Sequence, residues 1–467
     1  MPAKTTSKPA ETDVADGIVT VEVVPGGAVS GSIRPPGSKS ITNRALLISA
    51  LADPGPRDSR LNGTLASEDT AVMIESLQRI GASIYSSDGG RRLRVSSLSP
   101  RSGSDEPIEL DVANSGTTIR FLTAALSALG GDYRLSGVPR MHERPIGDLI
   151  DAIAPIIEGS IEAESEGGCP PVRICSSGWS GDSIEVAGTV SSQYLSGLMM
   201  AAPLAGHDIE IRVQGELVSR PYVAMTADVM EAFGASVDCE WSDGDEDDRF
   251  LISESYQATD YAIEPDASAA SYFWAAAAIT GGDVKVVGLT SDAVQGDVEF
   301  VDILEQMGCT VTDERDGIRV AGRASNGGDF DMNGISDTVQ TLSVVAMFAG
   351  SPTRIRGVAH NRFKETDRIG DLARECRRLG ADVDEHEDGL TIHPLSDETV
   401  EAYQSGERTT RVETYDDHRM AMSLALAGLV LPGIRLVNPA CTAKTYPHFW
   451  ADLEVLTGRS HRWTSNP

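Results

Sequence analysis

The sequence predicts an α/β (α+β) protein of two similar domains, each built from three repeated units. Two observations lead to this prediction. One pattern recurs along the 467-residue chain: an amphipathic helix stops at a glycine and leads into a short β-branched strand. The copies lie roughly 75 residues apart, too far for a solenoid of about 20 to 50 residues per repeat. Six units, each with about two helices and several strands, would fill the chain.

The copies occupy residues 70–84, 150–161, 223–237, 301–311, 372–383 and 451–458, the second being the weakest. The first five are predicted to stop at Gly81, Gly159, Gly234, Gly308 and Gly380. Glycine can end a helix in the left-handed conformation without a Cβ penalty. One such stop is typical of many α/β proteins, whereas five at one interval indicate a repeat. Segments 192–205 and 271–280 are apolar nearly all round, which predicts helices inside their domains.

Composition narrows the function classes. The formal net charge of −31 disfavours binding nucleic acid, so an anionic ligand would need the few cations concentrated at its site. Six cysteines without a CxxC pair disfavour a disulfide framework or a metal site. No apolar run approaches the roughly 18 residues that cross a membrane. Residues 1–17 lack the apolar stretch of a signal peptide and predict a disordered tail, so we expect a cytoplasmic protein.

Several polar motifs stand where helices are predicted to begin. In PPGSKSITNRALL, Lys39, Ser40 and Arg44 gather at a helix start predicted near residues 42–43. Backbone NH groups and the helix dipole favour an anion there, although an ordinary capped helix with surface cations explains the motif about as well. The spacing is not that of a P-loop, so ATP is not indicated.

A second motif, ANSGTTIRFLTAAL, repeats this design. Asn114 and Gly116 lead into an apolar helix that carries Arg120, and a simple N-cap is the equal alternative. In the following segment Arg140 and Arg144 precede a predicted helix start at Pro145, where at least one arginine could face a carboxylate.

A third group supplies neutral donors. Ser191, Ser192 and Gln193 begin a buried helix, and Ser219 and Tyr222 follow in ELVSRPY. Such groups suit the hydroxyls or the phosphate of a small polar ligand, but capping explains Ser191 equally well.

The C-terminal part holds the densest charges. Lys364, Glu365, Asp367 and Arg368 stand together, for which a salt-bridged helix start is the simpler alternative. Two later loops are Asp416–Arg419, ahead of an apolar helix, and the loop of Lys444, ahead of the last helix. The recurring cations are Lys39, Arg144, Arg368, Arg419 and Lys444, each at a helix start predicted to belong to a different unit. If these starts face one cleft, the ligand is small and multiply anionic.

With these motifs in order, the chain resembles the 5-enolpyruvylshikimate-3-phosphate synthases of the enolpyruvyl transferase family from about residue 18 to 458. PGSKSITNRALL, NSGTTIRFLTAAL, PRMHERPIGDL, RFKETDRI, TYDDHRMAM and CTAKTYP are similar to its signatures. The resemblance implies a two-domain inside-out α/β barrel of six βαβαββ-type units joined by two crossover strands. The implied domains are 18–36 plus 265–460 and 37–264.

The resemblance also implies transfer of the enolpyruvyl group of phosphoenolpyruvate to the 5-hydroxyl of shikimate 3-phosphate, without metal or organic cofactor, by a monomer. The implied shikimate 3-phosphate site comprises Lys39, Ser40, Arg44, Ser191, Ser192, Gln193, Ser219, Tyr222, Asp337 and Lys364. The implied phosphoenolpyruvate site comprises Lys39, Asn114, Gly116, Arg144, Gln193, Arg368, Arg419 and Lys444. Asp337 and Glu365 match the catalytic carboxylates, with Lys39 assisting; we expect a lysine beside each carboxylate to tune its pKa.

Two positions depart from the family pattern, in which Pro often replaces Phe121 and Asn replaces His360. Two rival functions remain. A transferase acting on UDP-N-acetylglucosamine would carry a reactive loop cysteine, and none lies between Gly116 and Arg144. A non-catalytic sensor of an anionic metabolite would not require Asp337 and Glu365.

Overall fold

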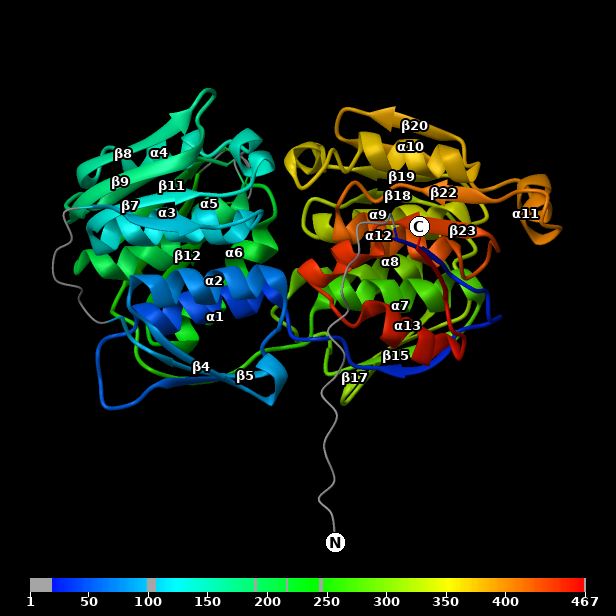
Figure 1. Cartoon of the computed structure of the whole chain (residues 1–467), viewed down its shortest axis with the longest axis horizontal. Helices are drawn as coiled ribbons and strands as arrows, with labels where there is room; N and C mark the ends of the chain where they lie inside the picture. The colour runs from blue at the N-terminus through cyan, green and yellow to red at the C-terminus, as the bar shows by residue number, and fades with distance from the viewer. Residues whose placement is uncertain (1–18, 99–105, 189–190, 216, 243–246, 466–467) are drawn as a thin grey trace, which may run out of the picture.

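The computed structural model describes residues 19–98, 106–188, 191–215, 217–242 and 247–465, so the expected disordered tail lies outside the described residues. These residues form two lobes side by side (Figure 1), each with its own hydrophobic core. The core of the first lobe runs from Ile41 to Ile263, and that of the second joins Val21–Val29 to residues 267–456.

Six four-stranded sheets form the outside of the lobes. The first lobe holds sheets in the orders β14-β3-β5-β4, β6-β7-β9-β8 and β10-β11-β13-β12. Their strands are β3 (Ser59–Asn62), β4 (Ser83–Ser87), β5 (Arg92–Ser96), β6 (Ile108–Asp111), β7 (Gly131–Ser136), β8 (Ile157–Ser165), β9 (Cys169–Trp179), β10 (Ser183–Ala187), β11 (Ile209–Gln214), β12 (Ser236–Glu240), β13 (Asp248–Ser253) and β14 (Asp260–Ala262).

The second lobe holds sheets in the orders β16-β17-β15-β2, β18-β19-β21-β20 and β22-β23-β1-β24. Their strands are β1 (Val19–Glu22), β2 (Ser30–Ile33), β15 (Asp283–Val287), β16 (Thr310–Glu314), β17 (Gly317–Ala321), β18 (Asp329–Asp331), β19 (Thr353–Arg356), β20 (Val383–His386), β21 (Gly389–Ile392), β22 (Thr410–Val412), β23 (Ile434–Val437) and β24 (Arg462–Ser465). In both lobes each sheet contains one parallel pair, such as β6 with β7 or β18 with β19. The predicted six-unit fold is confirmed.

Three almost wholly buried helices fill each lobe. They are α1 (Lys39–Leu51), α3 (Gly116–Leu129) and α5 (Ser192–Ala201) in the first lobe, and α7 (Ala267–Thr280), α9 (Val339–Met347) and α12 (His418–Ala427) in the second. Because apolar side chains surround these helices, they lie inside the sheets, which is the inside-out arrangement. The more amphipathic helices are α2 (Glu68–Ile80), α4 (Gly147–Ile153), α6 (Arg220–Ala232), α8 (Phe300–Gln306), α10 (Gly370–Leu379), α11 (Asp397–Gln404) and α13 (Phe449–Thr457).

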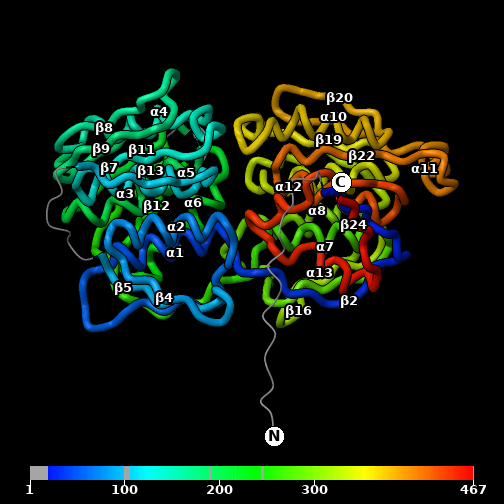
Figure 2. Tube along the Cα trace, viewed as in Figure 1, coloured from blue at the N-terminus to red at the C-terminus, as the bar shows by residue number. Residues whose placement is uncertain are grey.

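The chain passes between the lobes twice, as the trace in Figure 2 shows. The N-terminal strand β2 pairs with β15 in the second lobe, while β14 pairs with β3 in the first. The two crossings run together: the NH of Ser38 donates to the carbonyl of Glu264 at 2.8 Å, and the NH of Asp266 donates to the carbonyl of Pro36 at 2.8 Å. Both crossings therefore lie beside the starts of α1 and α7.

Three expectations about local structure are wrong. Helix α1 begins at Lys39, not at residues 42–43, because Ser38 caps it by accepting from the NH of Ile41 at 3.4 Å. Gly159 does not stop a helix: it lies within β8, where an added Cβ would stand 2.0 Å from the carbonyl oxygen of Cys175. Arg419 and Lys444 belong to one unit, since both flank β23.

Among the described residues, no helix combines the length and apolar character needed to cross a membrane.

Candidate active site

Two adjoining cavities lie between the lobes and contain most of the predicted site residues. The first chamber is lined by Lys39, Asp69, Gly116, Thr117, Arg120, Arg144, Gln193, Asp337, Lys364, Glu365, Arg368 and Arg419. The second chamber is lined by Lys39, Ser40, Arg44, Thr117, Ser192, Gln193, Ser219, Tyr222, Ser336, Asp337 and Lys364. Five residues line both chambers, which therefore adjoin: Lys39, Thr117, Gln193, Asp337 and Lys364.

Four of the buried helices, α1, α3, α5 and α12, have first-turn residues that line these chambers. Ser115 caps α3 by accepting from the NH of Thr118 at 3.2 Å, and Asp417 caps α12 by accepting from the NH of Arg419 at 2.8 Å. Each helix start carries partial positive charge, which lowers the free energy of an anion nearby. The sequence motifs that suggested anion binding therefore meet at one place.

Asp337 stands between two arginines from other segments. It lies in the short 3-10 helix η5 (Ser336–Thr338), and its carboxylate accepts from Arg419 at 2.6 Å and from Arg368 at 3.3 Å. Burial alone would raise the pKa of Asp337, but the charges of Arg419, Lys364 and Arg368 outweigh it and hold that pKa well below its usual range. Asp337 is therefore an ionised carboxylate before any ligand binds.

Glu365 has a comparable environment in the first chamber. Its carboxylate lies 2.8 Å from Arg368 Nη2 and 3.0 Å from Lys444 Nζ. Burial opposes ionisation, but Arg368, Lys444 and Arg144 hold the pKa of Glu365 well below its ordinary value.

The expected pairing of each carboxylate with a lysine is only partly right. Arginines provide the shortest contacts of Asp337, and Lys39 lies 3.5 Å from a different carboxylate, that of Asp69. Burial lowers the pKa of Lys364 to about 8, although the charge of Asp337 acts in the opposite direction.

Arg368 is the most completely enclosed cation of the site, with 2 % of its surface exposed. Its Nε donates to Asp417 at 2.7 Å, in addition to its contacts with Asp337 and Glu365. Burial disfavours its charge, but these three carboxylates raise the pKa of Arg368 above its ordinary value. The neighbouring His418 is also buried; burial and the charge of Arg419 hold its pKa well below the ordinary value, so its imidazole is neutral.

The site arginines of the first lobe lack such partners. Within the described ranges, Arg44, Arg120 and Arg144 have no carboxylate within ion-pair distance. Arg44 donates to the hydroxyls of Thr226 at 2.7 Å and Ser196 at 3.1 Å. Burial lowers the pKa of Arg44 to about 10 and that of Arg144 to about 10. The guanidinium groups of Arg44 and Arg144 are therefore charged near neutral pH without a carboxylate in ion-pair contact.

Gly116 is needed where Arg144 crosses the start of α3. A Cβ added to Gly116 would stand 2.4 Å from Arg144 Nη2. Arg144 Nη1 also donates to the carbonyl of Asn114 at 3.3 Å. Asn114 and Lys444 themselves line a third cavity that shares Glu365 with the first chamber.

The second chamber has mainly neutral walls. Ser219 sits at the start of α6 with φ of 58°, and its NH donates to Asn333 Oδ1 in the second lobe at 2.7 Å. Gln193 accepts from Arg120 Nη1 at 2.5 Å and donates to Thr117 Oγ1 at 3.3 Å. Ser191 does not line the described cavities: it caps α5, accepting from the NH of Gln193 at 3.3 Å.

Four lining residues were missing from the predicted site. Asp69 lies within the capping box of α2, between Ser67 and Thr70, and nothing in an acidic sequence distinguishes this buried carboxylate from the many exposed ones. Arg120, Thr117 and Ser336 each lie within one turn or two residues of a predicted site residue. Adjacency along the first turns of α3 and η5 was the signal that could have found them.

The two departures from the family pattern have different settings. Phe121 is completely buried, with the guanidinium of Arg44 5.2 Å from its ring centre, so it belongs to the core beneath the second chamber. His360 lies in η6 (Ala359–Phe363), and burial and the nearby charge of Lys364 lower its pKa to about 4. Its Nε2 has no hydrogen-bond partner among the described residues, whereas the amide of Asn361 donates to the carbonyl of Ser336 at 3.0 Å.

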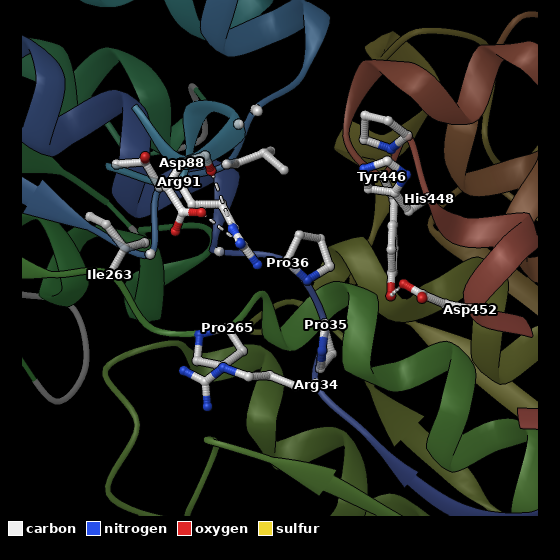
Figure 3. Close-up of a pocket in the computed structure, with 17 residues that line it drawn as sticks. Arg34, Pro35, Pro36, Asp88, Arg91, Ile263, Pro265, Tyr446, His448 and Asp452 are labelled. Carbon is white, nitrogen blue, oxygen red and sulfur yellow. Dashed lines mark hydrogen bonds and ion pairs between the residues drawn. The ribbon is translucent and has the colours of Figure 1, made fainter. Parts of the chain in front are cut away.

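A larger cavity lies at the crossings (Figure 3), and it contains none of the predicted site residues. Arg34 on the first crossing and Arg91 face it, but so do Asp88 and Asp452. Two arginines are thus balanced by two aspartates, which makes this cavity a poor site for a multiply charged anion. Within the described part of the chain, no group of three or more His, Cys, Asp or Glu side chains could hold a metal ion.

Comparisons with known proteins identify relatives that cover most of the chain. Residues 23–453 match the family model described as EPSP synthase (3-phosphoshikimate 1-carboxyvinyltransferase). The 3-phosphoshikimate 1-carboxyvinyltransferase of Nostoc punctiforme is 43% identical over 425 residues, covering 90% of this chain and 95% of its own length. That of Nitrosomonas europaea is 43% identical over 437 residues, covering 91% and 96%.

Solved structures share the fold. An EPSP synthase from Acinetobacter baumannii superposes with a TM-score of 0.74 at 23% identity, covering 96% of this chain and 100% of that one. The enolpyruvyl transferase NikO from Streptomyces tendae superposes with a TM-score of 0.72 at 18% identity, covering 97% and 100%.

Proposed function

The chain belongs to the EPSP synthase (3-phosphoshikimate 1-carboxyvinyltransferase) family, and from this premise we propose that its two substrates bind side by side in the two chambers. Its activity is the transfer of the enolpyruvyl group of phosphoenolpyruvate to the 5-hydroxyl of shikimate 3-phosphate, with release of phosphate, in the shikimate pathway to aromatic amino acids. The domain boundaries given above, a monomeric state and a cytoplasmic location remain predictions.

We assign phosphoenolpyruvate to the first chamber. The observation that carries this assignment is the convergence of Lys39, Arg144, Arg368 and Arg419 on one small cavity in a protein of net charge −31. A ligand with one carboxylate and one phosphate would be matched by four cations, while the charges of the lining carboxylates leave a net positive wall. Lys444 and Asn114 reach the ligand from the adjoining third cavity.

Shikimate 3-phosphate is assigned to the second chamber. Ser40, Ser192 and Ser219 offer hydroxyls, and Arg44 and Lys364 offer charge. Hydroxyl and amide donors suit the ring hydroxyls of the substrate, and cations suit its phosphate. Tyr222 forms part of the same wall.

The chambers suggest which carboxylate serves which proton transfer. Asp337 lines both chambers, so it can take the proton of the 5-hydroxyl as that oxygen attacks the neighbouring phosphoenolpyruvate. Glu365 lines the first chamber without the second, so it can protonate the methylene carbon and later remove a proton from the resulting methyl group. Cations around the first chamber stabilise the departing phosphate.

The low pKa of Glu365 fits its role as an acid only if substrate raises it. The anions of phosphoenolpyruvate would pair with Arg368, Lys444 and Arg144, which now hold the pKa of Glu365 low. Neutralising those cations raises the pKa of Glu365 toward the range of a general acid. Binding is thus expected to bring a proton to the site.

A phosphate-release assay tests the assignment of activity and substrates. The purified chain is mixed with phosphoenolpyruvate and either shikimate 3-phosphate or UDP-N-acetylglucosamine. Release of phosphate with shikimate 3-phosphate, but not with UDP-N-acetylglucosamine, supports the proposal. Release with the UDP-sugar would support the rival transferase, and binding of both shikimate-pathway ligands without release would support a sensor.

A further inference from the structure

A buried carboxylate that lines neither chamber connects the two lobes beside the second chamber. Asp297 lies in the short helix η4 (Gly296–Glu299) of the second lobe and is 4% exposed. One of its oxygens accepts a hydrogen bond from the hydroxyl of Tyr222, in α6 of the first lobe, at 2.8 Å. The other accepts a hydrogen bond from the hydroxyl of Ser268, near the start of α7. Asp297 therefore contacts the chamber wall through a single side chain.

The backbone is built for this contact. Gly296 packs against Pro221 so closely that an added Cβ would lie 2.3 Å from the proline Cβ. Any other residue at Gly296 would push η4 away from the first turn of α6. Beside it, the hydroxyl of Ser219 donates to the carbonyl of Asn333 in the second lobe at 3.2 Å. The start of α6, which carries two residues of the second chamber, is thus held by the second lobe.

The charges around Asp297 make its contact sensitive to pH. The titratable groups that face it are Tyr222 from α6, Asp337 from η5 and Arg419 from α12, while α7 contributes the neutral Ser268. Burial, reinforced by the charge of Asp337, raises the pKa of Asp297 to about 7. In the protonated form one oxygen still accepts from Tyr222, and no second negative charge faces Asp337.

We propose that Asp297 is a positioning residue for shikimate 3-phosphate, which holds the Tyr222 hydroxyl across the lobe junction and so fixes one wall of the second chamber. This inference rests on the proposed assignment of that chamber. Asp297 acts through Tyr222 and touches neither substrate. Its effect belongs in the KM for shikimate 3-phosphate, and not in kcat.

Steady-state kinetics of Asp297→Ala and Asp297→Asn test the inference. Losing the acceptor in Asp297→Ala should raise the KM for shikimate 3-phosphate about tenfold and change kcat by less than about threefold. In the wild type that KM should rise as the pH increases from 6 to 8, because ionised Asp297 repels an anionic ligand. Asp297→Asn keeps an amide oxygen that accepts from Tyr222 but carries no charge. Its KM for shikimate 3-phosphate should therefore be nearly normal at pH 6 and should not increase between pH 6 and pH 8.

A double mutant separates positioning from general damage. If Asp297 acts through Tyr222, the KM of Asp297→Ala/Tyr222→Phe should be no higher than that of the worse single variant. The inference would be overturned if the KM increases of the two single variants multiply in the double variant. It would also be overturned if Asp297→Ala lowers kcat without changing the KM. Asp228→Asn, on α6 but outside both chambers, is the matched control and should retain wild-type constants at every pH.

Thermal unfolding gives a readout independent of activity. Because the folded pKa of Asp297 exceeds that of an unfolded aspartate, its contribution to stability is complete at low pH and is lost as the pH rises through about 7. The Tm of Asp297→Asn relative to wild type should therefore increase from pH 5 to pH 8.

If the wild type releases no phosphate from the two substrates, the proposed function fails, and a double-mutant cycle of Tm for Asp297→Ala and Tyr222→Phe still judges the contact. Additive losses of Tm would then overturn it, and coupled losses would support it. If the wild type is active but the KM for shikimate 3-phosphate is the same in wild type and in the Asp297 variants at every pH, only the positioning inference is overturned.

Discussion

The two lobes share one fold but treat their site arginines in opposite ways. In the second lobe Arg368 and Arg419 contact carboxylates, and those carboxylates raise their pKa values. In the first lobe Arg44 and Arg144 donate to hydroxyls, carbonyls or an amide oxygen, and burial lowers their pKa values. Similar helix starts in the two lobes therefore differ in whether their arginines are paired with carboxylates.

The difference indicates a division of labour. Burying a guanidinium without a carboxylate costs free energy, and an anionic substrate offsets that cost. An arginine already paired with Asp337 or Glu365 instead controls the protonation of that carboxylate. The first-lobe arginines are thus prepared to bind anions, whereas the second-lobe arginines both bind anions and control the protonation of the carboxylates.

The largest effect is expected from a variant that removes a proton-transfer group from the second lobe. Glu365→Gln keeps the size of the side chain but cannot exchange a proton with the methylene carbon. Turnover should fall by about 10²- to 10⁴-fold, while calorimetry still detects binding of both substrates. Unchanged phosphate release would remove Glu365 from the mechanism. Glu385→Gln, whose carboxylate pairs with Arg362 outside the chambers, should behave as wild type.

A pair of arginine deletions should separate the paired from the unpaired arginines by stability. Arg368→Ala leaves Asp417 and Glu365 buried without their main partner, so urea unfolding should show a loss of about 3–5 kcal/mol. Arg144→Ala removes a buried charge that has no carboxylate partner, so the free energy of unfolding should change by less than about 1 kcal/mol. Its KM for phosphoenolpyruvate should nevertheless rise. Equal stability losses would abolish the distinction between the lobes.

The smallest effect is expected from a variant that disturbs the packing of Arg144 against Gly116 in the first lobe. Gly116→Ala adds a Cβ that would stand 2.4 Å from Arg144 Nη2, so the guanidinium must move. The KM for phosphoenolpyruvate should increase about tenfold, because charge-assisted hydrogen bonds depend on geometry. The KM for shikimate 3-phosphate should stay the same. Gly55→Ala, with its nearest neighbouring atom 3.8 Å from the added Cβ, is the control.

Local sequence patterns predicted the six-unit fold correctly. The glycine stops at Gly81, Gly234, Gly308 and Gly380 follow helices that lead into strands, as expected. Gly159 broke the pattern because a close approach to Cys175, and not a helix end, requires glycine there. Sequence alone could not tell these two demands apart.

The pairing within the site was less predictable. Asp337 and Arg419 are 82 residues apart in the chain, and Lys444 and Glu365 are 79 residues apart. No local sequence pattern can therefore predict either pair. Asp69 was missed for the same reason. A carboxylate becomes the partner of Lys39 only when α1 and α2 pack together.

By itself the sequence determined the repeat, the buried helices and the kinds of side chain at their first turns, because helical periodicity, capping and glycine stops act over a few residues. Only the tertiary structure decided which arginines meet carboxylates and which remain without them. That choice depends on burial and on distances between units far apart in the chain, and these set the electrostatic energy of every charge in the site.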